Sequence, residues 1–269
     1  MIMRSRLTLV FPLIAFSALL YLAPPPVSGQ AKAQVKAKVK GYTAPRTPEG
    51  HPDIQGIWQA MNTAAVNLED HIAVLDMPAG LSVIVDPPDA KIPYTPAAAQ
   101  KQKENFKNRA KADPLNICYI PGVPRVMYLP FPMQIVQTPK YVLIASEFAH
   151  TLRTIYMNGT KHPEVALFWI GDSRGHWEGE TLVVDVANHL PDTWFDRSGN
   201  FHSDALHITE RITRTEPDIL TYQATLEDPQ VFTRPWTIRM LLYRHKEPDF
   251  KLLEYECNAY LEDAEKERK

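Results

Sequence analysis

The second half of the chain, from residue 133 onward, is a succession of short segments with the length and composition of β-strands. They are rich in β-branched and aromatic residues, and turn-forming residues separate them with almost no helical pattern between. The candidates span residues 133–138, 141–148, 151–157, 165–170, 181–187, 205–214, 219–228, 236–244 and 251–260. Successive short strands joined by tight turns pair antiparallel and close into a barrel or fold into a sandwich. We therefore expect a mainly β protein built on an antiparallel sheet.

The region before these strands differs from them in composition and periodicity. Residues 51–130 are rich in proline and poor in periodicity, apart from a first candidate strand at 54–60 and one helix at 97–112. Thr95-Pro96 is placed to start that helix, whose thin apolar side predicts a surface position. We expect residues 51–130 to wrap around the barrel as part of a single domain spanning 51–269.

The first thirty residues are typical of a targeting segment. Arg4 and Arg6 precede an apolar run over residues 7–23, and PPPVSGQA then supplies small residues suited to cleavage. We interpret 1–30 as a signal peptide and 31–50 as a linker, which predicts a periplasmic or secreted protein with no integral span after cleavage. The run is near the short limit of a membrane span, so an uncleaved anchor is the alternative.

Cysteine content and charge agree with export. The chain has 2 cysteines and a formal net charge of −2. In an oxidising compartment Cys118 and Cys257 could form a disulfide, and two separately buried thiols are the alternative. No long basic tract occurs beyond residues 32–40, so nucleic-acid binding is not expected.

The pentapeptide GDSRG, residues 171–175, fits the G-x-S-x-G pattern of hydrolase nucleophiles. That motif needs a helix directly after the serine, whereas the sequence continues toward the strand-like TLVVDV. We therefore interpret GDSRG as a turn, and a nucleophilic Ser173 is the less favoured alternative. Asn158-Gly159 predicts a second turn, a two-residue hairpin.

Residues 169–214 concentrate aromatic, histidine and charged side chains. Aromatic walls with a few convergent polar groups form small-molecule pockets, and histidine beside a carboxylate can transfer protons near neutral pH. We predict His207 as an acid–base group, Arg211 or Arg153 as an anion stabiliser and Asp185 or Asp196 as the orienting carboxylate, with His202 folding over the barrel mouth. The candidate substrate-binding residues are Trp169, Trp177, Trp194, Tyr222 and Tyr243. Each of these side chains could instead be an ordinary core or structural residue.

Cofactor motifs do not occur in the sequence. It contains no HxH, no HExxH, no glycine-rich dinucleotide motif and no P-loop, so we predict no cofactor and no metal. His202, His207 and Glu210 could meet a metal ion only if a bulge reset which way they face.

Several segments together resemble a group of exported bacterial proteins of uncharacterised function. These are GHPDIQGIW, ICYIPGVPR, KHP, WIGDSRGHWEGETLVVD, HSDALHITERITR and EDPQVFTRPWT. GIW, residues 56–58, is also similar to the G-x-W of lipocalin-like barrels, in which the tryptophan closes the barrel base. The resemblance implies an antiparallel β-barrel of calycin type and brings no catalytic residues with it.

The sequence thus predicts an exported enzyme that performs cofactor-independent acid–base chemistry of lyase, dehydratase or isomerase type. Its substrate would be a bulky molecule, with an aromatic ring as one option, held in the barrel. The alternative is a non-catalytic lipocalin-like carrier of a hydrophobic small molecule, and a third is a structural envelope protein. The sequence leaves the substrate and the oligomeric state open.

Overall fold

The computed structural model describes residues 42–257. The predicted signal peptide and residues 31–41 of the predicted linker lie outside the described residues, as do residues 258–269. The elements are β1 (Gly56–Ala60), β2 (Ile84–Asp86), α1 (Pro96–Ala112), η1 (Pro114–Ile117), η2 (Arg125–Met127), β3 (Met133–Gln137), β4 (Tyr141–Ser146), β5 (Leu152–Tyr156), β6 (Asp172–Glu178), β7 (Thr181–Ala187), β8 (His207–Glu216), β9 (Ile219–Glu227) and β10 (Trp236–Arg244).

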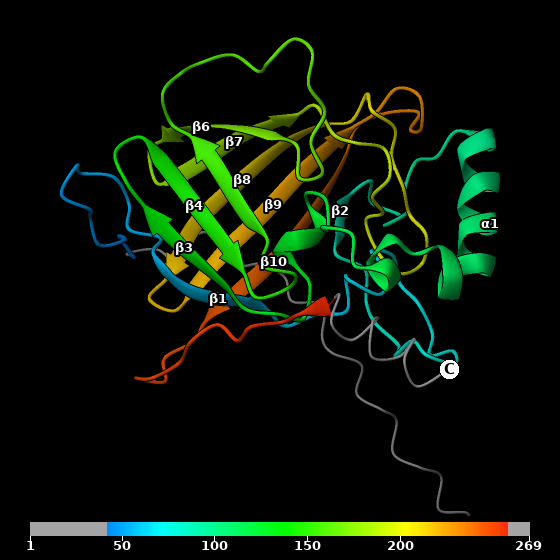
Figure 1. Cartoon of the computed structure of the whole chain (residues 1–269), viewed down its shortest axis with the longest axis horizontal. Coiled ribbons are helices and arrows are strands. Elements are labelled where there is room, and N and C mark those ends of the chain that lie inside the picture. The colour runs from blue at the N-terminus through cyan, green and yellow to red at the C-terminus, as the bar shows by residue number, and fades with distance from the viewer. Residues whose placement is uncertain (1–41, 258–269) are drawn as a thin grey trace, which may run out of the picture. The chain divides into compact units, whose positions relative to one another are not determined.

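The strands form a closed barrel, as Figure 1 shows. Nine strands follow one another in the order β1, β3, β4, β5, β6, β7, β8, β9, β10, and β10 pairs with β1 to close the ring. The short β2 pairs with β10 beside the ring. The predicted fold class is confirmed: the protein is mainly β, with one α-helix in the described part of the chain and a barrel consistent with a lipocalin-like architecture. The helix begins and ends within one residue of its predicted bounds, and the Thr95 hydroxyl accepts a hydrogen bond from the Ala98 N–H.

One junction departs from the predicted antiparallel order. β5 and β6 run parallel and share two residue pairs, Ile155 with Ser173 and Tyr156 with Arg174. A crossover loop, residues 157–171, connects them, so the hairpin predicted at Asn158-Gly159 is wrong. Gly159 does adopt a positive φ of 68°, but the chain continues into the crossover loop.

The crossover loop also contains the predicted strand 165–170, which does not form. Its first apolar residues face outward, with Val165 95% exposed and Leu167 48% exposed, so this run lacks the half-buried alternation that strands need. The strand lies instead in β6, where GDSRG was predicted to be a turn. Small residues on its inner face, Ser173 and Gly175, hid the apolar alternation that marks the other strands.

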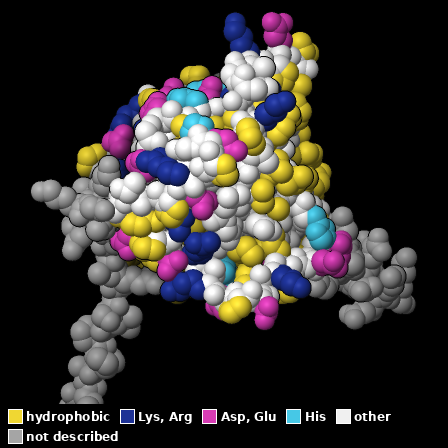
Figure 2. Space-filling model, turned by 90° about the vertical axis from the view of Figure 1, so that its left-hand side faces the viewer, with side chains coloured by type: hydrophobic (Ala, Val, Ile, Leu, Met, Phe, Trp, Pro, Cys, Tyr) yellow, Lys and Arg dark blue, Asp and Glu magenta, His cyan; other side chains and the backbone are white. Residues whose placement is uncertain are grey.

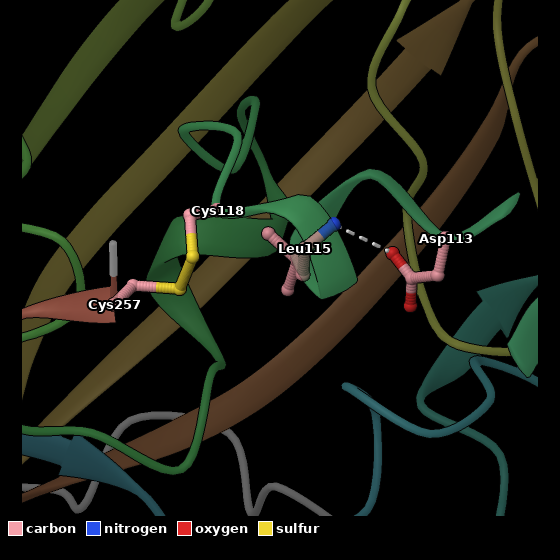
Figure 3. The surroundings of a disulfide bond; sticks show 4 residues. All are labelled: Asp113, Leu115, Cys118 and Cys257. Atoms are coloured by element: carbon pink, nitrogen blue, oxygen red, sulfur yellow. Dashed lines mark hydrogen bonds between the residues drawn. A yellow bond between two sulfur atoms is a disulfide. The ribbon is translucent and has the colours of Figure 1, made fainter. Parts of the chain in front are cut away.

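The C-terminal segment 251–257 was predicted to begin a strand and instead forms a strap outside the barrel. Tyr255 makes a single parallel bridge with Phe148. The predicted disulfide is confirmed: Cys118 and Cys257 are bonded, with Cα atoms 5.6 Å apart and a sequence separation of 139, so the separate-thiol alternative is excluded. Figure 3 shows how the bond ties the strap to η1, whose Leu115 N–H donates to the Asp113 carboxylate that caps the helix.

The two ends of the barrel are covered differently. We call the end where β4, β7 and β9 begin the mouth end, and the opposite end the plugged end. At the plugged end, η2 inserts buried side chains and the loop 188–206 packs over them, with the Phe195 ring 6.0 Å from Trp236 at the start of β10. α1 lies outside that loop, and Asn105 donates a hydrogen bond to the Gly199 carbonyl. In Figure 1, α1 and the first described residues lie on opposite sides of the barrel.

At the mouth end, residues 42–55 form a segment that we call the lid. The sequence assigned residues 42–50 to a linker, but Ala44 and Thr47 are buried. Gln137, the last residue of β3, accepts a hydrogen bond from the Ile54 N–H at 2.7 Å and donates one to the Pro52 carbonyl at 3.0 Å. The lid is therefore an ordered part of the domain.

Trp58, the tryptophan of the GIW motif, is fully buried at this end. Its indole N–H donates to the Ile54 carbonyl at 3.0 Å, and the Arg214 and Arg244 guanidiniums lie 5.9 and 5.8 Å from its ring. Trp58 therefore lies at the mouth end, whereas the lipocalin-like pattern predicts a tryptophan that closes the barrel base. None of the described helices is long and apolar enough to cross a membrane.

Candidate functional site

The barrel interior contains a buried ion pair between Arg153 of β5 and Glu210 of β8. Both side chains are 1% exposed or less, and the guanidinium bonds both carboxylate oxygens, with Nη1 to Oε1 at 3.0 Å. The Tyr222 hydroxyl donates to Glu210 at 2.7 Å, and Arg153 also donates to the Ser173 hydroxyl at 3.0 and 3.1 Å. Burial and the adjacent Glu210 carboxylate raise the pKa of the Tyr222 hydroxyl well above its ordinary value.

This inner network explains three sequence predictions. Arg153 and Tyr222 point inward as predicted, and Ser173 accepts hydrogen bonds inside the wall. Buried charges are tolerated when each has its hydrogen-bonding partners, and here the partners are protein side chains. The network therefore fits a structural role, and the catalytic and substrate-binding assignments of Arg153 and Tyr222 stay predictions.

His207 and Arg211 lie on the outer face of β8, so the prediction that they point into the barrel is wrong. Their side chains are 44% and 41% exposed, and Arg211 pairs with Glu178 of β6 at 2.9 Å. Side chains alternate along a strand, and burial of Ile208 and Ile212 sends every second residue outward. The same alternation carries Glu210 inward, which the prediction did not use.

The outer wall holds a second polar cluster beneath the crossover loop. His162 Nδ1 lies 2.6 Å from Asp172 of β6, and its Nε2 lies 3.1 Å from Asp185 of β7. Asp185 also contacts His207, and Arg174 binds Asp172 at 2.6 Å. Asp185 thus orients a histidine as predicted, but outside the barrel, and the cluster anchors the loop.

His162 was missed as a candidate, although the KHP segment that contains it was one of the family-like segments. The crossover loop brings it to β6 and β7, and the spacing from residue 162 to residues 172 and 185 gives no hint of this. Only the parallel β5–β6 connection makes the contact possible.

Asp196 and His202 lie in the plugged end and are fully buried. Asp196 accepts hydrogen bonds from the Leu68 N–H at 3.0 Å and the Asn200 amide at 2.6 Å. Burial nevertheless raises the pKa of the Asp196 carboxyl to about 7. His202 interacts with the Thr193 hydroxyl at 2.7 Å, and burial lowers the pKa of its ring. His202 therefore covers a barrel end, as predicted, but at the closed end and away from solvent.

His189, in the same loop, packs edge-on against His202 with ring centroids 5.7 Å apart. It is fully buried, and neither ring nitrogen has a hydrogen-bond partner within the described residues. Burial, together with the nearby charges of His202 and Arg153, lowers its pKa well below the ordinary value, so His189 is neutral.

The predicted aromatic residues are not gathered around one site. Trp169 contacts Tyr119 in the loops, Trp194 bridges to Phe201 in the plug, and Tyr243 faces outward with 40% exposure. Trp177 on the inner face of β6 is the one predicted substrate-binding tryptophan that lines the cavity described next.

A cavity of about 340 Å³ opens at the mouth end between the lid and the strands β3 to β6. Its apolar lining comes from Val142, Met157 and Trp177, and its polar lining includes Glu49, His51, Gln137 and His176. His51 of the lid stacks on Trp177, with ring centroids 5.5 Å apart and planes 11° from parallel. The lid is held on its other side by an ion pair between Arg46 and Glu180.

The parallel junction creates this cavity. β5 ends at Tyr156 while β6 continues to Glu178, so the second half of β6 pairs with β7 on one side and has no paired strand on the β5 side. Gly175 is needed at the wall because a Cβ there would lie 2.6 Å from the Met157 sulfur and 2.7 Å from Ile155 Cγ2. Figure 2 looks onto the left-hand side of Figure 1 and shows histidines and charges of both signs across that face, with apolar side chains along one edge.

Sequence reasoning missed the cavity residues other than Trp177. Glu49 and His51 were assigned to the linker and the start of the wrapping segment, and His176 was one of many polar residues in 169–214. Within residues 42–257, no group of three or more His, Cys, Asp or Glu side chains is arranged to hold a metal ion. A scan against protein-family models finds no match to the chain, and a search of curated proteins finds none either.

Proposed function

We propose that the protein is a lipocalin-like binding protein that holds a small planar molecule in the mouth cavity. The observation that carries the proposal is the cavity itself, with Trp177 on one wall and the lid across it. Its volume lies within the roughly 300–1,000 Å³ range of small-molecule sites, and it combines apolar walls with a few polar groups as such sites do. This is the carrier alternative that the sequence predicted.

Export is part of the proposal. The bond between Cys118 and Cys257 supports it, because disulfides of this kind persist in oxidising compartments. The leader predicted from the sequence supports it independently.

Acid–base catalysis is the second candidate function, with different groups from those predicted. His207 and Arg211 on the outer wall lose their support as catalytic residues, but His51 and His176 both line the cavity. A ligand held between two imidazoles is within reach of proton transfer. Recovering the bound compound chemically unchanged after long incubation supports a carrier, and a changed compound supports an enzyme.

A thermal-shift screen with neutral, planar ring compounds tests the binding proposal. Compounds that bind the native state raise the melting temperature, by more as the ratio of ligand concentration to dissociation constant increases. Trp177→Ala should remove the shift, because it deletes the flat wall of the cavity. Trp194→Ala is the matched control, since Trp194 is also a half-buried tryptophan but lies in the plug. Hits that stabilise the wild type and Trp177→Ala equally, or a screen without hits, would contradict the proposal.

A further inference from the structure

We infer that the mouth cavity prefers planar ligands that carry a positive charge over ligands of the same shape that carry a negative charge. The inference rests on the proposed function, because it assigns a ligand class to the same site. The charges around the cavity provide the argument.

Glu49 is the one Asp, Glu, Lys or Arg side chain among the described residues that line the cavity. It belongs to the lid and makes no ion pair or hydrogen bond with another of the residues 42–257. A carboxylate without a partner keeps its full attraction for an incoming cation.

The arginines next to the cavity do not balance Glu49, because each already has a carboxylate partner. The pairs are Arg46 with Glu180, Arg174 with Asp172, and Arg211 with Glu178. An anionic ligand would therefore have to compete with a carboxylate for each of these guanidiniums, while a cationic ligand meets Glu49 directly.

Two lysines lie close in the chain to residues that line the cavity. Lys140 follows the lining residue Pro139 in the turn between β3 and β4, and Lys161 lies in the crossover loop two residues after the lining Gly159. Neither lysine lines the cavity, and both are exposed to solvent. Attraction falls with distance and with screening by salt, so the carboxylate inside the lining outweighs the ammonium groups outside it.

The aromatic wall acts in the same direction. The face of a tryptophan ring carries negative potential and attracts cations that approach within about 6 Å. Trp177 lines the cavity beside the Met157 thioether, and His51 of the lid stacks on its ring, so a ring bearing an ammonium group would have to share or replace that stacking to contact the Trp177 face.

Isothermal titration calorimetry with three indoles of matched shape tests the inference. The probes are tryptamine, which is cationic, indole-3-ethanol, which is neutral, and indole-3-acetate, which is anionic. We expect tryptamine to bind about threefold to tenfold more tightly than indole-3-acetate at low salt, with the gap narrowing as salt is added. Working at pH 8, above the usual titration range of histidine, keeps imidazolium charge out of the comparison.

Glu49→Gln should bring the tryptamine and indole-3-acetate affinities to within about twofold, because it keeps the shape of the lid and removes the charge. The matched control is Glu104→Gln, an exposed carboxylate on α1 at the opposite end of the barrel, which should leave the preference unchanged. Equal or tighter binding of indole-3-acetate, or a preference that survives Glu49→Gln, would overturn the charge inference alone. Failure of all three indoles to bind would instead contradict the proposed function, and the charge inference with it.

Discussion

At the plugged end of the barrel, polar side chains are buried and, apart from groups such as the His189 ring nitrogens, hydrogen-bonded within the protein, whereas at the mouth end they are exposed around a cavity. Arg125 and Asp113 next to η2 make two hydrogen bonds of 2.8 Å, with both side chains less than 5% exposed. Glu49 and His51 at the mouth are exposed, and the His51 ring stacks on Trp177. The comparison teaches that polar groups at the plugged end and in the interior are held by contacts within the protein, while those at the mouth are open to solvent.

The largest expected effect comes from the inner ion pair. Glu210→Ala should lower the free energy of unfolding by about 3–5 kcal/mol, because it leaves the Arg153 charge buried without its carboxylate. Urea denaturation measures this, and Arg211→Ala, the neighbouring outward residue, is the control with an expected loss within about 0.5 kcal/mol. The double variant Arg153→Met with Glu210→Leu should recover much of the loss. If Glu210→Ala and Arg211→Ala lowered the free energy of unfolding equally, the interior ion pair would not contribute more to stability than the outer wall does, which would contradict this prediction.

Loss of the disulfide is expected to have the next largest effect. Replacing Cys118 and Cys257 with serine should cost about 2–4 kcal/mol, since the bond closes a loop of more than a hundred residues in the unfolded chain. Thermal melts with and without reductant measure it in the wild type. Binding at the mouth should be unchanged once the variant is folded, and loss of binding in the folded variant would show that the strap also shapes the cavity.

Asp196 gives the plugged end a pH dependence of its own. Its pKa is about 7 in the folded protein and about 4 in an unfolded chain, so between these values the folded state holds a proton that the unfolded state releases. Stability from this group is full below about pH 4 and is lost as pH rises through 7. Asp196→Asn should therefore become more stable relative to the wild type by about 2–3 kcal/mol between pH 5 and pH 8. A stability difference that stays constant with pH would contradict this.

The smallest expected effect on stability lies at the mouth. Gln137→Ala removes two hydrogen bonds between β3 and the lid and should cost about 1 kcal/mol. Limited proteolysis should show faster cleavage in residues 42–53. The loss in free energy of ligand binding should exceed the loss in free energy of unfolding. Unchanged proteolysis would show that the lid is held by other contacts, such as the Arg46–Glu180 pair.

The sequence predicted those parts of the fold that depend on local patterns. β-branched runs with turns between them identify most of the barrel strands, Thr95-Pro96 marks the start of α1, and export predicts the bond between Cys118 and Cys257. These features depend on neighbouring residues or on compartment, so a single sequence contains them.

The sequence did not predict features that depend on distant contacts. β6 forms a strand because it completes the barrel, although Gly175 weakens its apolar alternation. Residues 165–170 have a strand-like composition but no neighbouring strand to pair with. Alternation alone does not decide which face of β8 points into the barrel. One face carries His207 and Arg211, and the other carries Glu210 among isoleucines, so both faces contain charged residues. Burial of Glu210 becomes favourable only through Arg153, which lies 57 positions earlier in the chain.

The single parallel junction has a consequence for how this architecture could change. A closed barrel in which every pair of neighbouring strands is antiparallel must contain an even number of strands, because strand direction alternates around it. The odd ring found here is possible because β5 and β6 point the same way. A related chain that replaced the crossover loop with a tight reversal would have to gain or lose a whole strand, and in doing so it would close the gap from which the binding cavity is made.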